Sequence, residues 1–200
     1  MENSFKKMLR GYQEFRNKYA EGDQSIMHYL SYHGQQPQVM VVACCDSRVD
    51  PALILQCDPG DLFVVRNVAN IIPPYEIDDA HHGTSAALEF GIRFLKVKHL
   101  VILGHSQCGG IQTLFACKHA NKNDFISNWV SIINDNCDST IDADEYAKLA
   151  IKKSWQNCLT FPWVKERVDM QALAIHQWYF DIKAGRISAY SEEDGEFKSL

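Results

Sequence analysis

Short apolar runs alternate with amphipathic segments along most of the chain, and the two patterns predict different elements. The runs at 39–44, 62–65 and 100–103 have the length and the composition of buried strands. Apolar residues at helical spacing instead predict helices over 3–20 and 83–96. This alternation indicates a mainly parallel sheet flanked by helices, an α/β fold with right-handed crossovers.

The segment before the first strand predicts an N-terminal helical arm, residues 1–33. Its first helix repeats apolar side chains every three or four residues. A second helix is expected to begin with Asp23 as its cap and to end near Gly34. The first helix has too much aromatic surface to stay in water, so the arm must dock on another surface.

The second half of the chain predicts two more helices, over 125–136 and 144–159. A late strand follows at 172–180, and residues 186–190 form its hairpin mate as an antiparallel edge strand. No repeat or linker interrupts the pattern. We therefore expect a single domain of residues 1–200, in which the arm precedes an α/β catalytic core at 38–190.

Composition and charge limit the classes of partner and site that the chain is expected to have. A net charge of −5 with interspersed acids and bases provides no basic stripe for nucleic acid. The longest apolar run, 39–45, is too short for a membrane span, and the first residues lack a secretory signal, so a cytoplasmic protein is expected. Seven cysteines at irregular spacing favour reduced thiols and a metal site over a disulfide framework.

Two motifs carry the candidate chemistry. Cys44-Cys45-Asp46-Ser47-Arg48 ends one predicted strand, and His105-Ser106-Gln107-Cys108 follows another. Both therefore project from the carboxyl edge of the sheet, where open α/β folds build sites. Cys44, His105 and Cys108 form a donor set that Zn²⁺ prefers, and three protein ligands leave a position for water. The alternative is that the cysteines are buried as small hydrophobes.

Asp46 and Arg48 indicate a catalytic rather than a structural metal. A carboxylate so close to a ligand can occupy the open metal position itself, unless a bidentate arginine holds it away. Asp46 would then accept a hydrogen bond from the nucleophile and orient it. The alternative is an ordinary ion pair at a strand end.

These motifs resemble those of the beta-class carbonic anhydrases, whose pattern is Cys-x-Asp-Ser-Arg followed by His-x-x-Cys. The resemblance runs from about Gly34 to Tyr190 and includes 58–70, Gly83-Thr84 and His176-Gln177-Trp178. It implies one Zn²⁺ per subunit and reversible hydration of CO₂ to bicarbonate and a proton, by attack of zinc-bound hydroxide.

The resemblance also implies a substrate site. Gln35 matches a residue near the substrate oxygens, Phe63, Val68 and Phe90 match an apolar lining, and the Gly109 backbone N–H matches an oxygen-binding donor.

Three further positions place the chain within the family. Some members have a regulatory bicarbonate pocket, and its three positions are occupied here by Val41, Arg66 and Phe180. This set of residues implies the plant-type, constitutively open form.

Family members exchange the N-terminal arm, so the resemblance implies a homodimer or homotetramer with the active site at the dimer interface.

Other functions compete with this interpretation. The same zinc scaffold suits hydrolysis of CS₂ or COS, which are linear, apolar analogues of CO₂. A zinc-stabilised binding or bicarbonate-sensing protein would show no turnover, but it would not need Asp46, Arg48 or Gln35. Thiol-disulfide exchange is disfavoured because the chain contains no Cys-x-x-Cys pair.

Overall fold

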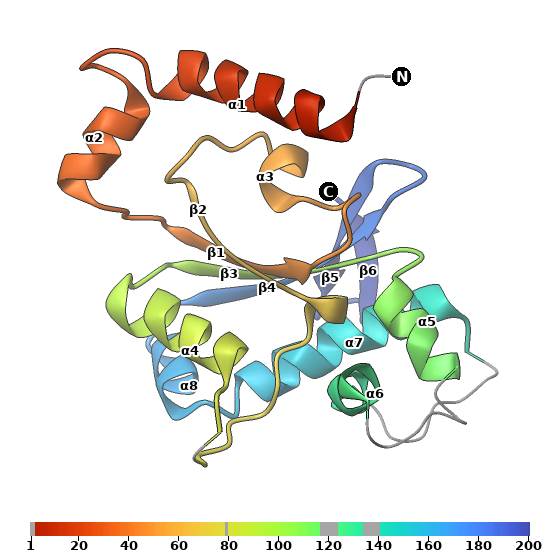
Figure 1. Cartoon of the computed structure of the whole chain (residues 1–200). Helices are drawn as coiled ribbons and strands as arrows, with labels where there is room; N and C mark the ends of the chain where they lie inside the picture. The colour runs from red at the N-terminus through yellow and green to blue at the C-terminus, as the bar shows by residue number, and fades with distance from the viewer. Residues whose placement is uncertain (1–2, 79, 117–123, 134–140) are drawn as a thin grey trace.

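A computed structural model describes residues 3–78, 80–116, 124–133 and 141–200, and its centre is a six-stranded sheet of order β2-β1-β3-β4-β5-β6 (Figure 1). The first four strands in this order are parallel, whereas β5 and β6 are antiparallel to their neighbours. The strands are β1 (Val39–Cys44), β2 (Leu62–Asn67), β3 (His99–His105), β4 (Ala174–Asp181), β5 (Arg186–Ser191) and β6 (Glu196–Ser199). The mainly parallel α/β sheet predicted from the sequence is confirmed.

Helices lie on both sides of the sheet, but they cover its two faces unequally (Figure 1). On one side are α1 (Ser4–Tyr19), α2 (Ile26–His33) and α3 (Pro51–Ile54). On the other are α4 (Gly83–Glu89), α5 (Gly109–Ala116), α6 (Phe125–Val130), α7 (Ala143–Cys158) and α8 (Pro162–Asp169). In the described part of the chain, no helix is long and apolar enough to cross a membrane.

The alternation of side chains along β1 divides the core between these faces. Met40, Val42 and Cys44 join a large apolar cluster on the side of α4, α7 and α8. Val41 and Ala43 join only a small cluster on the other side. Helix α1 contributes no buried residue to either cluster, so the second face is thinly covered within one subunit.

Several predicted boundaries differ from the structure for local reasons. Ser25 caps α2, not Asp23, because its side chain accepts a hydrogen bond from the His28 N–H at 3.3 Å. The helix predicted over 83–96 changes to a π-helical turn, η2 (Phe90–Phe94), after α4. The predicted helix over 125–136 ends its regular α-helical part at Val130, and residues 134–136 lie outside the described ranges.

The antiparallel C-terminal edge of the sheet is confirmed, but it contains one strand more than predicted. Strand β5 pairs with β4 as expected, but β6 adds one more strand outside it and forms the edge. The sequence pattern does not predict β6, because this strand is short and polar and has only one large apolar residue, Phe197. Helices α3 and α8, which were not predicted, each begin with a proline at the first helical position, where its missing N–H costs nothing.

Close packing of β3 on α7 gives a first testable prediction. A Cβ placed on Gly104 would lie 2.7 Å from two side-chain carbons of Ile151, which is fully buried. We expect Gly104→Ala to cost about 1–3 kcal/mol, because an overpacked core must shift backbone or rotamers. That corresponds to a melting temperature lower by about 2–10 °C.

Thermal unfolding of Gly104→Ala and of a control, Gly83→Ala, tests this packing. A Cβ on Gly83 meets nothing within 4 Å, so the control should unfold near the parent temperature. Equal melting temperatures for Gly104→Ala and the parent would contradict the close approach of β3 and α7.

Candidate metal centre and active site

Three buried side chains meet at the carboxyl edge of the sheet. Cys44 ends β1, His105 ends β3, and Cys108 stands immediately before α5. The sulfur and imidazole nitrogen atoms that they offer all lie within 4.8 Å of one another. Each residue is at most 4% exposed. The fold therefore brings together the three residues that the sequence predicted as zinc ligands.

The ring of His105 is oriented by its own turn. Its Nδ1 lies 2.8 Å from the carbonyl oxygen of Ser106, and because a carbonyl only accepts, Nδ1 must carry the proton. Nε2 is then a free lone pair, and it is buried without a hydrogen-bond partner. A neutral imidazole with one nitrogen held by a carbonyl is the usual arrangement of a metal-binding histidine.

The two thiols are placed as a pair. Their sulfurs are 3.8 Å apart, and two sulfurs bound tetrahedrally to one zinc at about 2.3 Å each would also lie about 3.8 Å apart. A hydrogen bond from the Cys108 thiol is the main reason that the pKa of Cys44 is lowered to about 4. His105 and the backbone N–H groups of Asp46 and Ala69 also lower this pKa, whereas burial raises it. The contact with Cys44 raises the pKa of Cys108. A cation between the sulfurs would relieve this competition, so the donor set fits zinc.

Asp46 is held by Arg48 in a bidentate contact beside the cluster. The Arg48 Nε donates to Oδ1 at 2.9 Å and Nη2 donates to Oδ2 at 2.7 Å. The backbone N–H of Arg48 adds a third bond to Oδ1 at 2.9 Å. Hydrogen bonding to Arg48 is the main reason that the pKa of Asp46 lies below its usual range. The carboxylate is thus ionised and engaged by arginine.

Two of the predicted substrate residues lie close to the ligands. Gly109 is the first residue of α5, next to Cys108. Val68 begins the short helix η1 (Val68–Asn70), and a Cβ placed on Gly110 would lie 2.5 Å from a methyl carbon of Val68. The absent side chain of Gly110 thus lets η1 pack against the start of α5.

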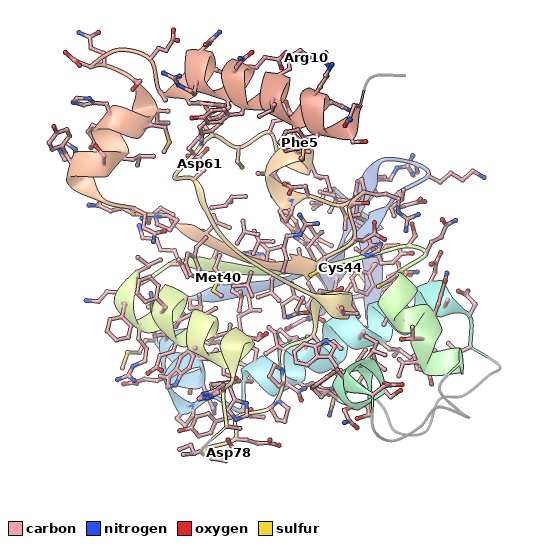
Figure 2. All side chains as sticks on the ribbon, viewed as in Figure 1. Phe5, Arg10, Met40, Cys44, Asp61 and Asp78 are labelled. Atoms are coloured by element: carbon pink, nitrogen blue, oxygen red, sulfur yellow. The ribbon has the colours of Figure 1, made fainter. Side chains whose placement is uncertain are left out.

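The other three predicted substrate residues are not brought to the metal cluster of the same subunit. Phe63 pairs with Met40 near the start of β1, whereas Cys44 pairs with Asn67 at its end. Figure 2 labels Met40 and Cys44, which are four residues or about 13 Å apart along the strand. The ring of Phe90 packs on Phe63 with centroids 5.8 Å apart, and Gln35 is an exposed residue that precedes β1. All three therefore lie towards the amino end of the strand.

Comparison with known proteins shows to which family the chain belongs. The carbonic anhydrase family model matches residues 39–187. A carbonic anhydrase of Synechocystis is 32% identical over 196 residues, which cover 92% of this chain and 70% of that protein. The solved structure of the beta-carbonic anhydrase CcaA is similar with a TM-score of 0.86 and 30% identity, over 99% of this chain and 100% of that one. The chain belongs to the beta-carbonic anhydrase family.

A second solved structure bears on assembly. A tetrameric beta-carbonic anhydrase of Sordaria macrospora is similar with a TM-score of 0.75 and 28% identity, over 94% of this chain and 97% of that one. The family reaction is the zinc-dependent, reversible hydration of CO₂ to bicarbonate and a proton, so this chain is a lyase that uses zinc.

In this beta-carbonic anhydrase, Arg66 has a structural role that the motif did not reveal. It donates to the carbonyl oxygens of Cys44 at 2.9 Å and of Asp46 at 2.8 Å, and it pairs with Asp50 at 2.7 Å. Arg66 thus fixes the backbone on both sides of Cys45. The sequence analysis named Arg66 only as a position of the regulatory pocket, and nothing in the sequence pattern indicated its bonds to the backbone around Cys45.

Asp144, at the start of α7, supports the second motif and also escaped sequence analysis. It accepts a hydrogen bond from the Gln107 N–H at 2.8 Å, and the Gln107 carbonyl accepts one from Arg48 at 3.2 Å. Gln107 has a φ of 54°, a conformation that non-glycine residues rarely adopt. These bonds hold the strained turn between His105 and Cys108. No local pattern links Asp144 to that turn, because the two are far apart in sequence.

Proposed function

We propose that Cys44, His105 and Cys108 bind the zinc of this carbonic anhydrase and that Asp46 orients the nucleophile that attacks CO₂. The observation that carries this assignment is the free Nε2 of buried His105 beside two paired thiols and an arginine-held carboxylate. A purely structural metal would need four protein ligands and no such carboxylate. In the described residues, the cluster offers three.

Zinc, when bound there, lowers the pKa of a coordinated water and supplies hydroxide near neutral pH. The residues of the chain then orient the nucleophile and set the charges around it. The ionised carboxylate of Asp46 accepts a hydrogen bond from the nucleophile, and Arg48 keeps that carboxylate from becoming a ligand. The Gly109 N–H is the proposed donor to a substrate oxygen.

This arrangement also supports the constitutively open, plant-type form. Both Asp46 oxygens are engaged by Arg48, so this carboxylate would not compete with solvent or substrate for a zinc ion held by the three ligands. Val41, at a position of the regulatory pocket in other members, is fully buried, and Arg66 is engaged with Asp50 and two backbone carbonyls.

Stopped-flow CO₂ hydration, together with the metal content of the purified protein, tests the proposed function. We expect about one zinc per subunit and a hydration rate far above that of buffer. Bound zinc with no rate above buffer would refute the enzyme and favour a binding or sensing protein.

We further propose a homodimer, or a dimer of such dimers, in which each active site receives residues from both subunits. Three of the expected substrate residues lie away from the metal cluster of their own chain: Gln35, Phe63 and Phe90. We therefore expect them to contribute to the active site of a second subunit. The tetrameric Sordaria relative supports an assembly of this kind. A dimer would also cover the thinly covered face of the sheet.

Helix α1 is the proposed contact between subunits. Its apolar side chains remain in water within one chain: Phe5 is 61% exposed, Met8 64% and Tyr12 60%. Figure 1 shows the helix at the periphery of the subunit, on the thinly covered side of the sheet. An apolar helix face of this kind is typical of a protein interface.

The proposed interface predicts a change of oligomeric state. We expect Tyr12→Asp to weaken association strongly, because it places a charge in the middle of the apolar face. Sedimentation equilibrium measures the effect, and the matched control Asn17→Asp adds the same charge on the opposite side of α1. Association that is equally strong in Tyr12→Asp and the parent would exclude α1 from the interface.

We also propose that the enzyme works in the cytoplasm. The support is that Cys44, Cys45, Cys57, Cys108 and Cys158 are free thiols, as expected in a reducing compartment.

A further inference from the structure

A cavity of about 560 Å³ lies outside the metal cluster and is not used by the proposed mechanism. Its walls come from the loop before α4, from the start of α4, and from α6 and α7. None of the residues that line it is a predicted metal, catalytic or substrate residue of the carbonic anhydrase reaction. Cavities of this size hold small organic molecules.

One part of the wall is apolar. Pro73, Pro74, Trp129 and Ile132 line it, all of them partly buried. Trp129 is fixed in place because its indole N–H donates to the carbonyl oxygen of Val68 at 2.8 Å. The indole thus offers a rigid surface on which a planar apolar group can pack.

The remaining wall favours the binding of an anion. Lys153, half-buried on α7, has no ion pair or hydrogen bond to any residue that the structure describes. His81 adds an imidazole group, and Thr84 and Ser85 add hydroxyls. The imidazole of His82 also lines the wall, but its Nε2 is already paired with Asp78 at 2.7 Å. The one acid in the wall, Glu76, is exposed. A partly desolvated ammonium without a partner gains a charge-assisted hydrogen bond when a carboxylate enters.

We propose that this cavity binds a small organic monoanion, a carboxylate attached to a planar apolar body. The carboxylate pairs with Lys153, and the apolar body packs on Trp129 and the two prolines. This inference does not depend on the assignment of the zinc ligands.

Hydrogen bonds link the cavity wall to the segment that follows β2, which also pairs with the strand that carries Cys44. Asn67, which pairs with Cys44 across β1 and β2, donates to Thr84 Oγ1 at 3.3 Å. Trp129 holds Val68, and Asn157 donates to the Ile72 carbonyl at 2.9 Å. The segment from Asn67 to Ile72 is therefore bonded to residues that line the cavity, and through Asn67 it also pairs with the strand that carries Cys44.

Titration of the zinc-loaded enzyme with benzoate, followed by calorimetry, tests the proposal. We expect a dissociation constant of about a millimolar, as befits a ligand with few atoms. Lys153→Met keeps the length of the side chain and removes the charge, so it should weaken binding by about tenfold or more. Lys153→Arg should restore much of the affinity.

Carboxylates can also bind the catalytic metal, and a loss of affinity in Lys153→Met would place benzoate in the cavity, because Lys153 lies outside the metal cluster. Two further controls test the position and the charge. Lys152→Met, one residue away on α7 and packed instead over the ring of Tyr190, should bind benzoate like the parent. Benzyl alcohol, which has the same ring without the charge, should bind at least about tenfold more weakly than benzoate. Equal benzoate affinity in Lys153→Met and the parent, or no binding at all, would overturn the proposal.

Discussion

Replacing Cys108 with serine should remove both the zinc and the activity of this carbonic anhydrase. A hydroxyl is a far poorer ligand for zinc than a thiolate, and only two good donors would remain, Cys44 and His105. We expect zinc content to fall well below one per subunit and CO₂ hydration to fall by about a thousandfold or more, because the metal supplies the nucleophile. Atomic absorption and stopped-flow kinetics measure the two effects.

Cys45→Ser is the matched control for this variant. Cys45 is next to Cys44 in sequence, but it is exposed and lies outside the cluster. It should retain zinc and a rate within about twofold of the parent, since surface substitutions away from special features usually have small effects. Loss of zinc from Cys45→Ser together with retention in Cys108→Ser would show that the ligand set had been assigned incorrectly.

Asp46→Asn should separate metal binding from catalysis. The variant keeps the shape of the side chain and all three proposed ligands, so zinc content should stay near one per subunit. The amide loses the charge and one of the two acceptor oxygens that Arg48 now engages. We expect a loss of about a hundredfold or more in rate, in the range that correctly placed acid–base groups contribute.

Two companion variants make the Asp46 result specific. Arg48→Lys cannot form the bidentate contact, so a partial loss of rate is expected with zinc retained. Asp169→Asn removes a carboxylate from a surface ion pair with Lys165 and should leave the rate unchanged. Unchanged turnover in Asp46→Asn would refute the orienting role and reduce the contact between Asp46 and Arg48 to a structural ion pair.

The sequence by itself predicted the parallel sheet and the residues of the metal cluster. Buried parallel strands are apolar along their whole length, so β1 and β3 are visible as continuous runs. Because their carboxyl ends share one edge, Cys44 and His105 could be expected to meet even though they are distant in sequence. The bidentate pair of Asp46 and Arg48 is local, so its spacing alone indicated it.

Only the tertiary structure showed what holds this cluster in place. Arg66 and Asp144 act through hydrogen bonds to backbone groups, which leave no signature in a sequence pattern. The structure also showed that Phe63 and Phe90 lie at the other end of β1 from Cys44, because strand register sets that distance. Motifs report residues whose chemistry is needed, whereas register and long-range hydrogen bonds depend on how distant segments pack together.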